Sequence, residues 1–172
     1  MPCDSIVRSA TPADRKEIWR LALMGHREGG IFTLAPQKVN FFIQRALYPE
    51  LIPWHDTGPR GVIGVIGPAN AIEAVVFATI EEMWYSTEKF IDEKIVDVDR
   101  ECRNTMHART LIAWLKQQVV ETGIPLITGV VSTDRNEAKC RLYRKVFPKG
   151  GEFFIVRPNG PIIHRSSAAY IQ

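Results

Sequence analysis

The sequence has few cysteines and no long apolar run, and both absences exclude classes of protein. Its three cysteines, Cys3, Cys102 and Cys140, are widely spaced along 172 residues, so they indicate neither a disulfide framework nor a zinc knuckle. The longest apolar runs, such as AVVFATI, are far shorter than the roughly 20 residues of a membrane span. The N-terminus also lacks the basic flank and apolar block of a signal peptide. We therefore expect a cytoplasmic protein that does not enter a membrane.

Metal-binding motifs and a strong charge of one sign are missing as well. The four histidines, His26, His55, His107 and His164, form no HxH or HExxH pair, so we expect no metal site. The net charge of +3 is too small by itself to indicate a nucleic-acid partner. Hydrophobic residues make up 45% of the chain and charged residues 24%, which is typical of a globular protein.

The chain length predicts one domain with a single core. We expect that core to span about residues 5–157, with a C-terminal hairpin and tail over 158–172. Apolar periodicity and turn residues predict the element order β-α-α-β-β-β-α-β-α-β-β. The expected strands are SIVRSA, GVIGVIG, AIEAVVFATI, FIDEKIVDV, a buried IPLITGVV, GEFFIV and IIHR; the expected helices begin after Thr11 and at about Ala35, Thr105 and Arg135. This order favours an α/β (α+β) fold with a mixed, mostly antiparallel sheet and helices packed over it.

Polar residues gather where the strand ending in KIVDV gives way to a helix. A helix start presents unpaired N–H groups and partial positive charge, which suit an anion such as a diphosphate. Asn104 or Thr105 can serve as the N-cap, and Arg103 and Arg109 add cationic donors. The alternative is an ordinary capped helix with solvated arginines.

Two blocks of this region resemble the GCN5-related N-acetyltransferase family. The segment RNTMHA is similar to the family's Arg/Gln-x-x-Gly-x-Gly/Ala signature, with Arg103 and Ala108 at its ends. Downstream, NEAKCRLYRKVF is similar to the second conserved block, in which Asn136, Leu142 and Tyr143 correspond. The resemblance implies helices on both faces of the sheet and an acetyl transfer from acetyl-CoA to a primary amine by direct attack. It specifies no metal.

The resemblance also implies roles for individual residues. Met106 stands where the family has a glycine, and the Arg-x-x-x-His-Ala-Arg form resembles a variant of phage-encoded members. Tyr143 corresponds to the general acid that protonates the departing thiolate; otherwise it is a half-buried aromatic residue. His107 is expected to bind a phosphate or the backbone. The implied acetyl-CoA contacts are the backbone at Val96 and Val98, then Arg103, Asn104, Thr105, Met106, His107, Ala108, Arg109 and Asn136.

A general base is expected among the acidic residues of 81–101, with Glu81 and Glu93 as the first candidates. The same acidic run is also typical of a solvated hairpin edge. Trp84 and Tyr85 belong to this segment and can either shape an acceptor pocket or cap the core.

The alternative function is a non-catalytic module of the same fold, which binds CoA, protein or nucleic acid. The helix from about 135 to 147 is basic and can either reach CoA phosphates or form a solvated face. It carries no recognisable nucleic-acid motif, so we do not expect nucleic acid as partner. The acceptor amine is not specified, and a homodimer is compatible with the sequence.

Overall fold

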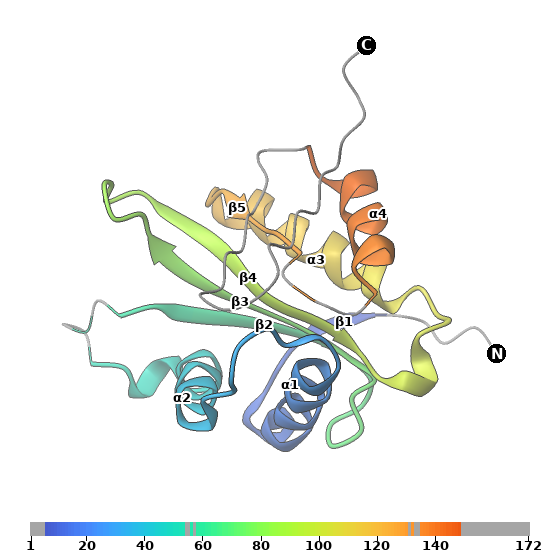
Figure 1. The fold of residues 1–172 in the computed structure, drawn as a ribbon. Helices are drawn as coiled ribbons and strands as arrows, with labels where there is room; N and C mark the ends of the chain where they lie inside the picture. Colours follow the sequence, from blue (N-terminus) through green and yellow to red (C-terminus); the bar gives the residue numbers. More distant parts are fainter. Residues whose placement is uncertain (1–5, 54–55, 57, 131, 133–134, 149–172) are drawn as a thin grey trace, which may run out of the picture.

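The computed structural model describes residues 6–53, 56, 58–130, 132 and 135–148. These residues form a five-stranded sheet in the order β1-β2-β3-β4-β5, antiparallel except for the parallel pair β4–β5. Figure 1 shows α1 and α2 on one face of this sheet and α3 and α4 on the other. The elements are β1 (Val7–Ser9), η1 (Pro12–Asp14), α1 (Arg15–Gly29), α2 (Pro36–Leu47), η2 (Pro49–Leu51), β2 (Arg60–Ile66), β3 (Ala74–Glu82), β4 (Lys89–Val98), η3 (Arg100–Cys102), α3 (His107–Thr122), β5 (Leu126–Ile127) and α4 (Asn136–Val146).

The predicted element order is confirmed from the first strand through the last described helix. The two final strands, GEFFIV and IIHR, fall within residues 149–172, outside the described part. The helix after Thr11 begins with the single 3₁₀ turn η1 before α1 follows. Asp14 accepts hydrogen bonds from the Thr11 N–H and hydroxyl, at 2.8 and 2.9 Å, and thereby fixes this entry. No helix of the described residues is long and apolar enough to cross a membrane.

The expected buried strand IPLITGVV is wrong in length and burial. Among the described residues of this segment, only Leu126 and Ile127 pair with β4, opposite Ile91 and Asp92, and Ile127 is 36% exposed. The chain therefore leaves β4 after two residues, although the apolar run continues.

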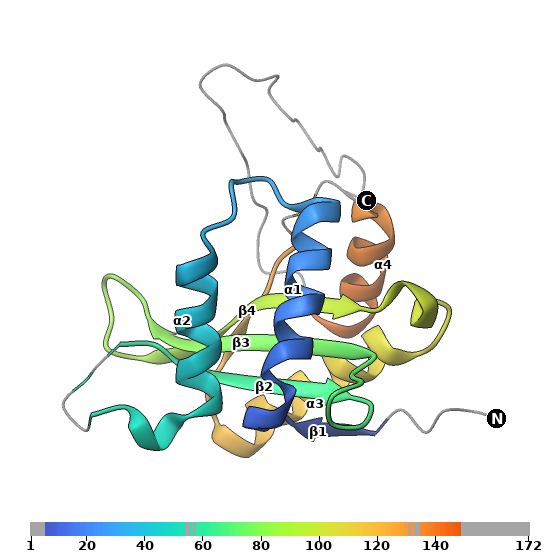
Figure 2. The same cartoon turned by 90° about the horizontal axis from the view of Figure 1, so that it is seen from below.

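Strand alternation divides the core into two layers. Val75 and Phe77 of β3 pack with Ile18 and Leu21 of α1, on the face that α1 and α2 cover in Figure 2. The alternate residues of β3 face the other way and pack with Leu111 of α3. Successive strand residues point to opposite faces, so both layers are built from one continuous apolar strand.

A β-bulge interrupts β4 at Lys94. Phe77 of β3 pairs with Ile95 and the next residue, Ala78, pairs with Glu93, so Lys94 is an extra residue in the ladder. A bulge of this kind reverses the alternation of the residues that follow it. Ile91 packs on the α3 side whereas Ile95 packs on the side of α1 and α2.

Candidate active site

A cavity of about 670 Å³ opens along β4 where β5 diverges from it. Its walls come from β4, the start of α3, and helices α1 and α4. The predicted site residues among its lining are Glu93, Val96, Val98, Arg103, Thr105, Ala108 and Tyr143. The fold therefore brings seven of these candidates to one cavity from three separate segments: β4, the start of α3 and α4.

The edge of β4 turns backbone N–H groups toward this cavity. The Asp99 N–H donates to the Glu73 carbonyl before β3 at 2.7 Å, and in an antiparallel strand alternate N–H groups point the same way. Those of Val96 and Val98 therefore point away from β3, toward the side where the described part of β5 no longer pairs. The Arg103 Nε donates to the Val98 carbonyl on that side at 3.3 Å. β4 and the described part of β5 thus diverge beside these N–H groups.

The helix α3 begins two residues later than expected. Met106, not Asn104 or Thr105, occupies the N-cap position. Thr105 still contributes, because its hydroxyl accepts the His107 N–H at 3.2 Å and donates to the Cys102 carbonyl at 2.6 Å. The Met106 backbone has φ of −83°, so this position does not require glycine.

Several predicted acetyl-CoA residues lie outside the cavity lining. Asn104, Met106 and Arg109 are exposed, while Asn136, at the first position of α4, accepts a weak hydrogen bond from the Cys140 thiol at 3.9 Å. The backbone N–H groups in the first turn of a helix have no carbonyl acceptor within the helix. Residues at the start of α3 can therefore contribute to the site through their backbone N–H groups although their side chains are exposed. The cavity side of that turn is formed by Ala108.

His107 does not face the cavity, contrary to the expected phosphate contact. Its ring is 0% exposed, and its Nε2 lies 2.6 Å from Glu73 Oε2. The imidazole therefore points into the interior, toward the loop before β3, while the adjacent Ala108 faces the cavity.

Tyr143 and Glu93 form a hydrogen-bonded pair on the cavity wall. The Tyr143 hydroxyl donates to Glu93 Oε1, and the Thr128 hydroxyl donates to the other carboxylate oxygen at 2.6 Å. Burial raises the pKa of Glu93, although both hydrogen bonds oppose the shift. Burial and the neighbouring Glu93 also raise the pKa of Tyr143 well above its usual range. The tyrosine therefore remains a protonated donor at neutral pH.

Glu81 lies outside the cavity lining. Its carboxylate accepts a hydrogen bond from Thr79 at 2.6 Å and pairs with Lys94 at 2.9 Å. Burial raises its pKa, but these partners outweigh that effect and the pKa is lowered. Glu81 is thus held as an ion-paired carboxylate.

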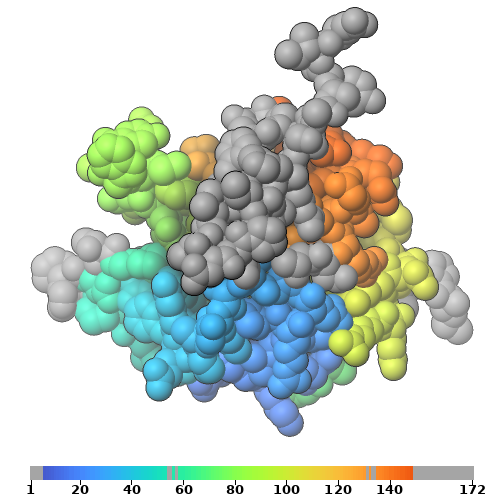
Figure 3. Space-filling model, in the orientation of Figure 1, coloured from blue at the N-terminus to red at the C-terminus, as the bar shows by residue number. Residues whose placement is uncertain are grey.

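The aromatic residues of the acidic segment neither cap the core nor line the cavity. Trp84 is 93% exposed and Tyr85 69% exposed, and their rings contact each other edge to face. The turn that carries them projects from the body of the molecule, as Figure 3 shows in light green.

Asp97 belongs to the acidic run of 81–101 but was not among the first candidates, and it lies on the α1 side of the cavity. Burial raises the pKa of Asp97 to about 6, with Lys139 and Arg103 opposing the shift and Glu28 supporting it. A Cβ at Gly25 of α1 would lie 2.1 Å from Asp97 Oδ2, so the glycine allows this close approach. No local pattern reveals such a contact between a helix and a distant strand.

Basic residues from the start of α3 and from α4 line part of the cavity. Arg103 pairs with Glu28 of α1, and Arg135 and Lys139 of the basic helix also line the cavity. Other basic residues of this helix, Arg141 and Arg144, are exposed. The helix therefore contributes both to the cavity wall and to a solvated face.

No protein-family model and no curated protein matches the chain, but solved structures do. A possible acetyltransferase from Clostridium difficile 630 has a TM-score of 0.63 at 17% identity, covering 92% of this chain and 98% of that one. Ribosomal-protein-alanine N-acetyltransferase from Brucella melitensis biovar Abortus 2308 has a TM-score of 0.63 at 12% identity, with coverages of 88% and 97%. An aminoglycoside acetyltransferase from an uncultured soil metagenomic sample gives 0.60 at 12% identity, with coverages of 88% and 93%. The chain therefore has the fold of the GCN5-related N-acetyltransferases.

Proposed function

We propose that this protein is an N-acetyltransferase that moves the acetyl group of acetyl-CoA to a primary amine by direct attack. The observation that carries the proposal is one cavity that joins three features: the edge of β4 that the described part of β5 leaves, the hydroxyl of Tyr143 and the first turn of α3. The solved structures of similar fold support it, because several are described as acetyltransferases.

In this proposal the backbone of β4 holds the acyl end of acetyl-CoA. The N–H groups of Val96 and Val98 hydrogen-bond the thioester carbonyl and the pantetheine arm, in place of a neighbouring strand. The diphosphate is received at the start of α3 by backbone N–H groups within 104–109, other than those of Thr105 and His107, which already donate to the Cys102 carbonyl and the Thr105 hydroxyl. Arg103 then exchanges its partner Glu28 for a phosphate oxygen, and charge-assisted hydrogen bonds compensate the loss.

Tyr143 and Glu93 act together on protons. Glu93 takes a proton from the ammonium group of the acceptor, which frees the nitrogen lone pair for attack on the thioester carbon. Tyr143 protonates the departing thiolate and regains a proton from Glu93 through their existing hydrogen bond. The ammonium loses two protons in all: one ends on the thiol and the second leaves to solvent.

Binding and turnover are tested separately. Isothermal titration with acetyl-CoA should show saturable binding, and a thiol-release assay over amines, peptides and aminoglycosides should reveal an acceptor. Replacing Tyr143 with Phe should lower the turnover rate by about 100-fold, the scale of a lost general acid, with little change in acetyl-CoA affinity. The matched control is Tyr48→Phe, since Tyr48 lies at the end of α2 and outside the cavity lining. An unchanged rate in Tyr143→Phe would remove this residue from the mechanism.

A second candidate function is a CoA-binding module without turnover. It is favoured by Met106, whose side chain is 55% exposed beside the proposed diphosphate position, where the family resemblance implies glycine. Saturable acetyl-CoA binding without thiol release across the whole panel would support the module and contradict the enzyme.

A further inference from the structure

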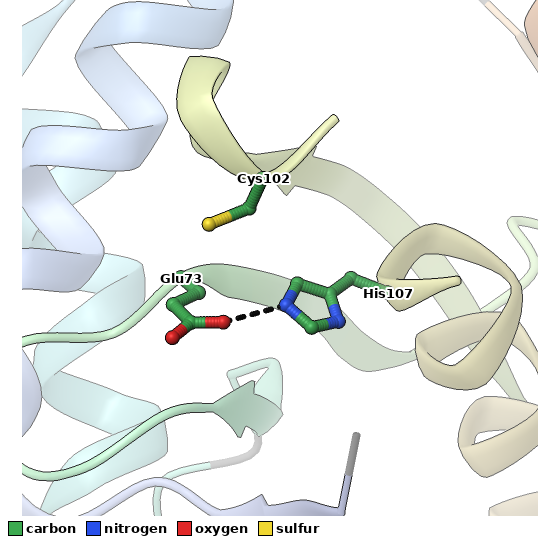
Figure 4. Close-up of side chains that lie close together, drawn as sticks. All are labelled: Glu73, Cys102 and His107. Carbon is green, nitrogen blue, oxygen red and sulfur yellow. Dashed lines mark hydrogen bonds and ion pairs between the residues drawn. The ribbon is translucent and has the colours of Figure 1, made fainter. Parts of the chain in front are cut away.

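Three potential metal ligands converge on the side of the α3 start that faces away from the cavity. Glu73 precedes β3, Cys102 ends η3 and His107 begins α3. One ligand atom from each lies within 4.8 Å of the other two. Figure 4 shows the thiol, the carboxylate and the imidazole directed toward one another. None of the three lines the cavity described above.

The donor set selects the metal. A thiolate, an imidazole and a carboxylate are ligands that Zn²⁺ accepts together, whereas Mg²⁺ and Ca²⁺ prefer oxygen alone. Tetrahedral zinc bonds of about 2.0–2.3 Å place neighbouring ligand atoms roughly 3.3–3.7 Å apart. The His107 Nε2 to Glu73 Oε2 distance of 2.6 Å is below this range, and the 4.8 Å limit for the set is above it. Side-chain movements of about 1 Å therefore suffice.

The backbone already holds the three ligands in place. The Cys102 carbonyl accepts hydrogen bonds from the N–H and hydroxyl of Thr105, at 3.1 and 2.6 Å. The Cys102 N–H donates to the Asp99 carbonyl at 2.9 Å, and the Asp99 N–H donates to Glu73 at 2.7 Å. The imidazole of His107 is fully buried, which restricts its orientation. A site with fixed ligands loses little conformational entropy on binding metal.

We propose that Glu73, Cys102 and His107 bind one Zn²⁺, with a water molecule at the fourth position. On binding, the Cys102 thiol gives up its proton, and His107 ligates through Nε2 in place of its hydrogen bond to Glu73. The metal then links the start of β3 to both ends of the 103–106 loop. This site stands independently of acetyl transfer. Its effect on the loop that receives the diphosphate rests on the proposed function.

The test uses the full chain, stripped with a chelator and titrated with Zn²⁺ against a chromogenic competitor. We expect one zinc per chain with submicromolar affinity, a higher melting temperature, and a thiolate-to-metal charge-transfer band when Co²⁺ replaces Zn²⁺. Cys102→Ser should abolish the charge-transfer band and weaken zinc binding at least about tenfold. Glu73→Gln should weaken zinc binding by a similar factor. Cys140→Ser is the matched control, because Cys140 is also a half-buried cysteine, and it should retain both properties.

Two results would overturn the proposal. One is the absence of stoichiometric zinc binding in the wild-type chain at micromolar metal, which would leave a structural hydrogen bond between His107 and Glu73. The other is zinc binding that persists in both Cys102→Ser and Glu73→Gln. Both results concern metal alone, so they are distinct from a failure to bind or turn over acetyl-CoA.

Discussion

Replacing Asp97 with Asn should stabilise the chain at neutral pH and not in acid. The carboxyl group lies between α1 and the edge of β4, close enough to Gly25 that a methyl group there would overlap it. Lys139 and Arg103 attract its charge and Glu28 repels it, but burial is the largest influence and raises the pKa from 3.8 to about 6. Asn has nearly the same shape without the charge, so the substitution isolates the cost of ionisation.

The sign and size of this difference in unfolding free energy follow from the number of protons bound by the folded and unfolded chains. Between about pH 4 and 6 the folded chain retains a proton on Asp97 that the unfolded chain has released, so the free energy of unfolding falls as pH rises. A shift from 3.8 to about 6 at about 1.4 kcal/mol per pH unit corresponds to at most about 3 kcal/mol. Asp97→Asn should therefore match the wild type near pH 3.5 and exceed its stability by about 2–3 kcal/mol at pH 8.

Urea denaturation of both chains across this pH range provides the measurement. The difference between their unfolding free energies removes most of the contribution of Glu93, which is present in both chains, because burial is the main cause of its raised pKa and Asp97 a smaller one. Asp92→Asn is the matched control, because Asp92 lies on the same strand but is ion-paired to Lys94. It should keep the wild-type decline above pH 4. A difference between Asp97→Asn and the wild type that stays constant with pH would refute the reasoning.

Three further predictions test the fold around the site. Leu111→Ala, in the buried contact between α3 and the sheet, should cost about 2–5 kcal/mol of unfolding free energy; the exposed Val120→Ala should cost less than about 0.5 kcal/mol. Gly25→Ala should lower the melting temperature despite the helix propensity of alanine, because its Cβ overlaps Asp97; equal losses with and without Asp97→Ala would contradict this cause. The hydrogen bond from Arg8 lowers the pKa of Asp14 to about 2. The free energy of unfolding of the wild type should therefore fall by about 1–2 kcal/mol between pH 4 and pH 2, measured by acid denaturation. The Asp14→Asn variant should lack this loss.

The order of elements was predictable because each carries a local signal. Thr11 and Asp14 mark the entry to the first helix, and a glycine ends α3: Gly123 adopts a φ of +69°, which few other residues accept. The β5 prediction was wrong because strand length depends on a pairing partner. The apolar run continues, but β4 and β5 separate after Asp92, and no local pattern reports that separation.

The two blocks that resemble the family predicted several residues of the candidate site but not the direction of every side chain. Arg103 and Ala108 of the first block and Tyr143 of the second line the cavity, whereas His107 of the first block faces the interior. Its direction is decided by Glu73, which is distant in sequence. Thr105 was one of two residues expected at the N-cap position of α3. It lies one residue before that position, but its hydroxyl still accepts a hydrogen bond from the N–H of His107, the first residue of the helix.

The bulge at Lys94 determines which helix each of the two buried acidic residues of β4 faces. Glu93 and Asp97 would share one face of a regular strand, but the extra residue sends the first toward α4 and the second toward α1. The extra residue in β4, and not the type of any side chain, thus determines which helix each acidic residue faces. Deleting Lys94 would exchange the partners of every residue after it, so β4 tolerates substitution far better than a change in the number of its residues.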